Sequence, residues 1–228
     1  MEVFEKEQDV GKGATLTQVG NEGTDDNCSL PPYMEQASTL WPFAPSHLTS
    51  PQLMIDIVKQ LPPIERASAL IEAYFTNLAW FLGPIGRSQV TAELIPLFYP
   101  LGRRNDRTKA GLSSDDSHND KSDILAAALE HPHDLALLLS VFASGAVADL
   151  TQAPDNAEGS RYHTLSLVTL GLQNIFEGGS LSACQAIFIN GTYEVHCGKR
   201  TGQEKSWKMF SLAMSLGNSV SYSYFNLC

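Results

Sequence analysis

Segment 132–150 restricts the possible folds more than any other part of the sequence. Drawn as a helix, it carries apolar side chains on nearly every side. Its apolar positions are Leu135, Leu137, Leu138, Leu139, Val141, Phe142, Ala146, Val147 and Leu150. A helix that is apolar all round is stable where other elements cover it completely. We therefore expect this segment to form the central helix of the core.

Further segments carry apolar residues at intervals of three and four, the spacing of a helix with one buried face. The clearest is 64–78, which follows Pro63; a shorter one at 90–98 should kink or end at Pro96. No segment alternates cleanly at a period of two, as a half-buried strand would. The sequence predicts an all-α array of six or seven helices, packed as antiparallel neighbours through short connections.

Three helices are expected after the central segment. Asp155 and Glu158 resemble a capping box at the start of the first, and Ser180 is placed to cap the second. The apolar stripes of the three are, in chain order, Tyr162, Leu165, Val168, Leu172, Ile175 and Phe176; Cys184, Ile187, Phe188, Gly191 and Val195; and Trp207, Phe210, Met214 and Gly217. We expect each stripe to face the core.

Polar segments are expected to lie outside this core. Residues 1–50 are acidic and then punctuated by prolines, a composition that predicts a disordered arm. Residues 102–123 are rich in charged residues, serine and asparagine, and predict a long internal loop. We place one domain at 51–220 and interpret 221–228 as an unrelated C-terminal tail.

The charge balance excludes one class of partner. The chain has 15 Lys and Arg against 25 Asp and Glu, a net charge of −10, which opposes binding to the phosphates of nucleic acid. We therefore expect no DNA binding by this chain alone. Serines and asparagines dilute the longest charge-free stretch, 209–228, so we also expect a soluble protein with no membrane partner.

No residue constellation indicates an enzyme. A nucleophile elbow of the Gly-x-Ser-x-Gly kind is absent from the sequence, as is a phosphate-binding glycine loop, so we expect no catalytic residues. The run His131-Pro132-His133-Asp134 has two interpretations, a helix start or metal ligands, and the first is favoured because no second Cys or His group accompanies it.

Two groups of side chains leave alternatives open. Tyr74, Trp80, Phe142 and Tyr162 could line an effector pocket, although aromatic residues on helical stripes more often fill the core. Arg66, Asp149, Glu158 and Arg161 are charges within otherwise apolar helices, and they either pair at helix interfaces or point to solvent.

Short segments spread over residues 51 to about 220 carry a family resemblance. They are Leu61 to Ala67, Leu70 to Phe75, Ala79-Trp80, Pro84-Ile85, Arg87, Glu93 to Ile95, Phe98-Tyr99, His133 to Leu138, Val141 to Ala146, Asp149-Leu150, Ala157-Glu158, Arg161-Tyr162, Ser180 to Ala186, and Trp207 with Ala213 and Leu216. In this order they resemble the fungal-specific transcription factor domain, the middle homology region of zinc-cluster regulators.

The resemblance implies a nuclear, all-α regulatory region that modulates transcription and works with other transcription factors or coregulators. Family members carry an upstream zinc cluster of six closely spaced cysteines, whereas only Cys28 precedes the domain here. No zinc or other cofactor is therefore expected in this chain, which looks like a truncated member that reaches DNA only through a missing or separate zinc-cluster domain. The alternative is a small-molecule effector-sensing or protein-interaction module without DNA binding of its own.

Overall fold

The computed structural model describes residues 30–43, 51–80, 83–99, 116–177 and 179–225. Within them the chain forms nine α-helices and one π-helical segment, and no strand. The helices are α1 (Pro32–Leu40), α2 (Pro51–Lys59), α3 (Ile64–Asn77), the π-helical η2 (Gln89–Leu94), α4 (Ile95–Phe98), α6 (Asp116–Glu130), α7 (Pro132–Ala148), α8 (Ala157–Leu170), α9 (Leu181–His196) and α10 (Gly202–Phe225). The all-α prediction is confirmed, and the expected six or seven helices were too few.

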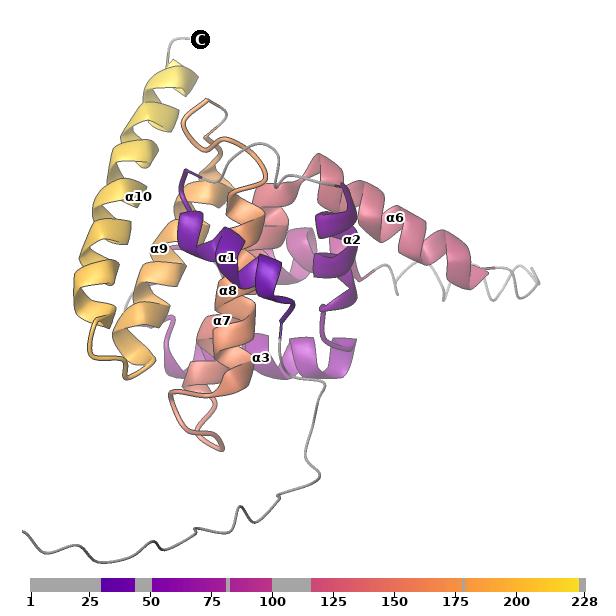
Figure 1. Ribbon diagram of the computed structural model, residues 1–228, viewed down its shortest axis with the longest axis horizontal. Helices are drawn as coiled ribbons and strands as arrows, with labels where there is room; N and C mark the ends of the chain where they lie inside the picture. Colours follow the sequence, from indigo (N-terminus) through magenta and orange to yellow (C-terminus); the bar gives the residue numbers. More distant parts are fainter. Residues whose placement is uncertain (1–29, 44–50, 81–82, 100–115, 178, 226–228) are drawn as a thin grey trace, which may run out of the picture.

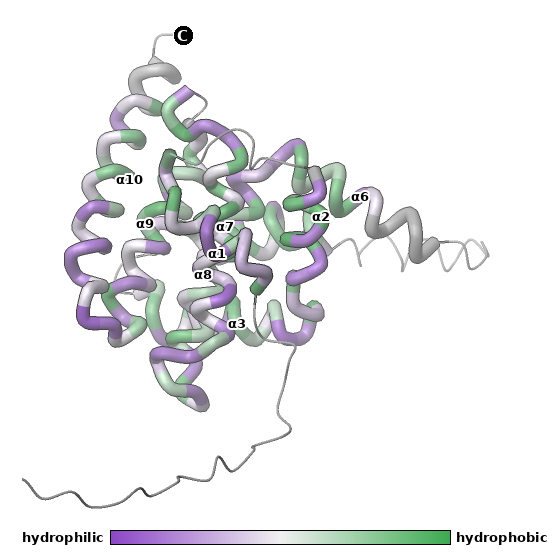
Figure 2. Tube along the Cα trace, in the orientation of Figure 1, coloured by the Kyte–Doolittle hydropathy of each residue, from purple (hydrophilic) through white to green (hydrophobic). Residues whose placement is uncertain are grey.

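Helix α7 occupies the centre of the bundle, as its composition predicts. Fifteen of its 17 residues are buried, and α3, α8 and α9 all pack against it (Figure 1). Many residues of the central helices are coloured as hydrophobic, whereas the coloured part of α10 carries both hydrophilic and hydrophobic residues (Figure 2). Burial of this apolar surface is the main force that assembles the helices around α7.

The helix starts follow local signals, with one correction. Ser180 caps α9 as expected, because its hydroxyl accepts a hydrogen bond from the Ala183 amide. The cap of α8 is Asn156 and not Asp155, since the Asn156 side chain accepts from the Gly159 amide at 2.6 Å. Helix α8 ends at Leu170, before the last residues of the predicted stripe; of these, Ile175 is buried as expected, but Phe176 is 52% exposed.

The predicted stripe of the last helix is wrong in phase. Its buried face consists of Ser206, Met209, Ala213 and Leu216, and it packs against α9. Trp207 is 72% exposed and Met214 is 64% exposed. Two stripes one residue apart both show helical spacing here, and the side that faces α9 is set by the fold and not by the larger side chain.

The structure also corrects three expected boundaries. Helix α1 lies inside the arm predicted at 1–50, and its Met34 and Ala37 are buried where α1 packs on α8. Helix α6 begins at Asp116 and α10 continues to Phe225, so parts of the expected loop and tail are helical. The remaining parts of these predicted segments, at 1–29, 44–50, 102–115 and 226–228, lie outside the described residues.

Candidate functional site

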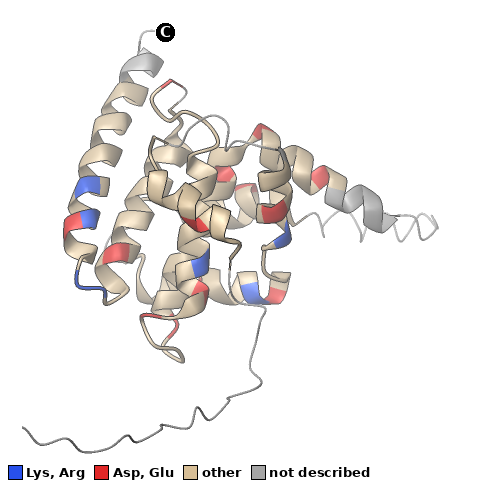
Figure 3. Cartoon of the chain, viewed as in Figure 1, with Lys and Arg blue, Asp and Glu red and all other residues tan. Residues whose placement is uncertain are grey.

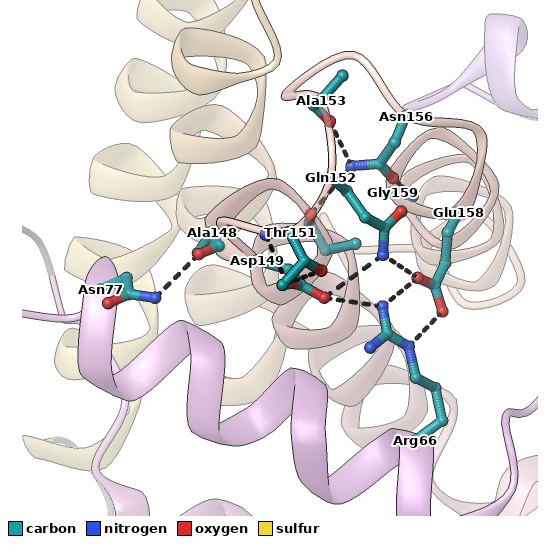
Figure 4. A network of polar contacts seen from close by, with 11 residues as sticks. Arg66, Asn77, Ala148, Asp149, Thr151, Gln152, Ala153, Asn156, Glu158 and Gly159 are labelled. Atoms are coloured by element: carbon teal, nitrogen blue, oxygen red, sulfur yellow. Dashed lines mark hydrogen bonds and ion pairs between the residues drawn. The ribbon is translucent and has the colours of Figure 1, made fainter.

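Arg66 joins three helices through ion pairs that its guanidinium makes with two carboxylates (Figure 4). From α3, its Nε donates to Glu158 Oε1 at 3.0 Å and its Nη2 donates to Glu158 Oε2 at 2.5 Å. The same Nη2 donates to Asp149 Oδ2 at 3.2 Å. Glu158 lies in the first turn of α8 and Asp149 follows the last residue of α7. The network therefore fixes α3 against the α7–α8 connection.

Neighbouring polar groups hold the two carboxylates in place. Asp149 Oδ1 accepts from the Thr151 amide at 3.1 Å and from the Thr151 hydroxyl at 2.7 Å. Gln152 Nε2 donates to Glu158 Oε2 at 3.2 Å. Asn77 Nδ2, from the end of α3, donates to the Ala148 carbonyl at 2.9 Å beside the network (Figure 4). Each carboxylate thus accepts several hydrogen bonds, which favours its charged form.

The pKa values follow from these contacts. The pKa of Asp149 falls to about 2, because Thr151 donates to its carboxylate twice and Arg66 and Gln152 add further hydrogen bonds that outweigh burial. Burial by itself would raise the pKa of Glu158, but the hydrogen bonds from Arg66 and Gln152 lower it overall. The pKa of Arg66 is raised, mainly by its hydrogen bonds to Glu158. All three groups are therefore charged at neutral pH, which suits a structural clamp better than acid–base chemistry.

The ion-pair network of Arg66, Asp149 and Glu158, called the clamp from here on, decides between the two interpretations of the charged residues. Arg66, Asp149 and Glu158 pair at a helix interface, as one interpretation of the sequence expected. Arg161 instead donates to the Tyr162 hydroxyl at 3.1 Å and lies over the same ring, with its guanidinium carbon 4.9 Å from the ring centroid. The sequence pattern identified the charged residues but could not show which of them meet.

The four aromatic residues of the expected effector pocket are not all brought together. Tyr74, Phe142 and Tyr162 are buried, and the rings of Phe142 and Tyr162 meet edge to face with their centroids 5.7 Å apart. Trp80 is 77% exposed, and its indole nitrogen donates to the Asn77 carbonyl. A ligand that contacts the three buried rings would require local repacking of the core.

Tyr74→Phe is expected to leave the stability of the chain unchanged or to raise it by up to about 1 kcal/mol. The Tyr74 hydroxyl is buried and has no hydrogen-bond partner among the described residues, so the substitution removes a desolvated polar group and no contact. Chemical denaturation of both proteins measures the difference. A loss of more than 1 kcal/mol would show that the hydroxyl makes a stabilising interaction.

The run from His131 to Asp134 lies at the start of a helix, which is the favoured one of its two interpretations. His131 precedes α7, and Pro132 is its first residue, where no backbone donor is needed. His133 is buried, which lowers its pKa, and its Nδ1 lies 2.9 Å from the Ser180 hydroxyl. In the described ranges, no group of three or more His, Cys, Asp or Glu side chains is arranged to hold a metal ion.

A second polar network, which the sequence analysis missed, is buried between α8 and α9. His163 of α8 lies between Asn190 and Glu194 of α9, with its ring nitrogens 2.8 and 3.2 Å from their oxygens. All three residues are buried. The spacing of Asn190 and Glu194, four residues apart on one helix face, was the available signal, but nothing in the sequence pairs them with His163.

Among the described residues no single helix is both long and apolar enough to cross a membrane; the segments Ser122–Glu130 and Pro132–Ala148, bent by 102°, meet that length and composition only when taken together. No protein-family model matches the chain, and neither a curated protein nor a solved structure matches it.

Proposed function

We propose that this chain is a non-catalytic regulatory module similar to the middle homology region of fungal zinc-cluster transcription factors. One observation carries the proposal. Three separate segments that resemble the family contain Arg66, Asp149 and Glu158, and these side chains meet in one ion-pair network. Residues that are distant in sequence and shared with a family pattern are expected to meet when the pattern reflects a common fold.

The proposed module works in the nucleus through protein partners. Transcription factors or coregulators would bind its helical surface, and contact with DNA would come only through a separate zinc-cluster domain. The net charge of −10 and the ionised, fully hydrogen-bonded carboxylates of the clamp support a binding role over an enzymatic one. This assignment does not require zinc in the chain itself.

The isolated chain is expected to show no measurable affinity for duplex DNA at physiological salt. Its net charge repels the phosphate backbone, so the non-specific attraction that most DNA-binding proteins use has the wrong sign. A gel shift with random-sequence duplexes, repeated at low and moderate salt, measures this. Tight binding that weakens as salt rises would contradict the proposal that DNA contact requires another domain.

A tethered-reporter assay tests the regulatory role. The chain is inserted between a heterologous DNA-binding domain and an activation domain in a fungal cell, and reporter output is compared with a polar linker of equal length. We expect the chain to change output severalfold at equal protein level. Output identical to that of the linker would contradict a regulatory role.

A small-molecule sensor is the second candidate, and the buried Tyr74 hydroxyl favours it. Because this hydroxyl has no partner among the described residues, a ligand acceptor placed there would satisfy it. A compound that binds at this position would raise the melting temperature of the wild-type chain more than that of Tyr74→Phe. Equal shifts for the two proteins would place the ligand elsewhere.

A further inference from the structure

The donors and acceptors of the buried network between α8 and α9 can be assigned by starting from Ser166. The Ser166 hydroxyl donates its only proton to the Ala136 carbonyl of α7 at 2.8 Å. It must therefore accept from Asn190 Nδ2, which lies 2.8 Å away and also donates to the Ala186 carbonyl at 2.9 Å. These two acceptors fix the orientation of the Asn190 amide, so its oxygen faces His163.

This orientation determines the protonation of His163. Its Nδ1 faces the Asn190 amide oxygen at 2.8 Å and must carry a hydrogen. Its Nε2 faces Glu194 Oε1 at 3.2 Å, and a carboxylate only accepts. Burial would raise the pKa of Glu194, but the hydrogen bond and charge of His163, together with Lys205, lower it overall. Both ring nitrogens of His163 therefore face oxygen atoms, and His163 and Glu194 meet in a buried ion-pair contact.

Glu194 is also the point at which α10 is attached. Lys205, in the first turns of α10, donates to the same Glu194 Oε1 at 3.4 Å. Gly202 allows this approach, because a Cβ there would lie 2.0 Å from the Glu194 carbonyl oxygen. The first turns of α10 carry basic residues and one acidic residue, and an acidic residue lies on the neighbouring end of α9 (Figure 3). The other Glu194 oxygen is buried and has no partner among the described residues.

We propose that the His163–Glu194 ion pair is a latch that holds α10 against α9 through Lys205. A buried carboxylate with one unpartnered oxygen is costly, so its charge persists only while His163 and Lys205 both face it. Helix α10 lies at the edge of the bundle and packs mainly on α9 (Figure 1). Opening the latch would therefore uncover Ser206, Met209, Ala213 and Leu216 of its buried face without disturbing the α7 core.

The groups around His163 and Glu194 come from several helices. On α9, Tyr193 stacks on the His163 ring with their centroids 4.3 Å apart, and Cys197 and Asp155 lie near Tyr193. Helix α7 contributes the Ala136 carbonyl, and α10 contributes Lys205. Among the described residues, Lys205 supplies the only hydrogen bond from α10 to Glu194. Removing its ammonium group should therefore open the latch.

Limited trypsin digestion of the full chain tests the latch. Lys208 lies within α10 and is cut only when that helix unwinds locally, whereas Arg161 of α8 reports unfolding of the core. We expect Lys205→Met to speed cleavage after Lys208 by about threefold to fivefold, the effect of losing a hydrogen bond from a lysine that is 55% exposed, with Arg161 cleavage unchanged. The matched control is Glu204→Gln, which removes an exposed pair with Lys208 on the same helix and should leave the rate near that of wild type.

Two results would overturn the latch. Cleavage after Lys208 at the wild-type rate in Lys205→Met, or an equal rise at Lys208 and Arg161, would show that Lys205 does not hold α10 separately from the core. Nitrogen-15 NMR of the His163 ring supplies an independent test at neutral pH. The Nδ1 atom is expected to carry a hydrogen that faces the Asn190 oxygen, and a ring with its hydrogen on Nε2 alone would contradict the network on which the latch rests.

Discussion

Gly145→Ala is expected to destabilise the fold by about 3 kcal/mol or more, the upper end of overpacking effects. Gly145 lies in α7 where α3 crosses it, and a Cβ there would lie 2.2 Å from the Leu70 carbonyl oxygen and 2.8 Å from its carbon. Both atoms are backbone, so no rotamer change relieves the clash. The two central helices would have to separate, and close packing would be lost along their whole contact.

Gly217→Ala is the matched control, because it makes the same chemical change in another helix. Nothing lies within 4 Å of the position that a Cβ would take at Gly217 in α10. Alanine has the higher helix propensity, so this variant should gain up to about 1 kcal/mol. Urea denaturation of both variants provides the comparison. Equal effects would show that the α3–α7 crossing is not as close as the structure places it.

Arg66→Met is expected to cost about 2 to 3 kcal/mol at neutral pH, because it leaves two partly buried carboxylates without their cation. The Arg66 side chain is 31% exposed, and water screening keeps the expected cost below that of a fully buried pair. Arg87→Met provides a control, since the Arg87–Glu72 pair is more exposed and should contribute less than about 1 kcal/mol. Denaturation at pH 7 measures both variants.

The effect of Arg66→Met should shrink in acid. The pKa values of Asp149 and Glu158 lie below their usual 3.8 and 4.5 in the folded chain. Groups with lowered folded-state pKa values add stability that is present above the unfolded-state pKa and is lost as the pH falls through the folded-state value. The difference between wild type and variant should therefore decline from about pH 5 towards pH 2. A difference that stays constant over this range would contradict the ion-pair network.

The parts of the fold that the sequence predicted are those that local signals decide. Helix α7 was recognised because its apolar residues leave no polar face, and the start of α9 because Ser180 suits a cap. The start of α8 was misplaced by one residue, since Asp155 and Asn156 are both acceptable caps and only the packed backbone selects between them. Local chemistry thus locates an element better than it locates its boundary.

The sequence patterns did not predict which residues distant in sequence meet, and the reason is physical. The face of α10 that packs on α9 includes Met209, and the exposed face includes Trp207, although both stripes have helical spacing. The partners of Arg66 lie 83 and 92 residues away, and no local rule connects them. His163 likewise meets Glu194 only through the packing of α8 on α9. Pairings of this kind depend on the tertiary fold, which a single sequence does not reveal.

The most direct test of the proposed regulatory role combines the reporter assay with a charge swap at the clamp. Reporter output is measured for the tethered wild-type chain, Arg66→Glu, and Arg66→Glu with Glu158→Arg, all at equal protein level. We expect wild type to change output relative to the linker, the single substitution to abolish the change, and the swap to restore part of it. Output equal to that of the linker for all three chains would contradict the account.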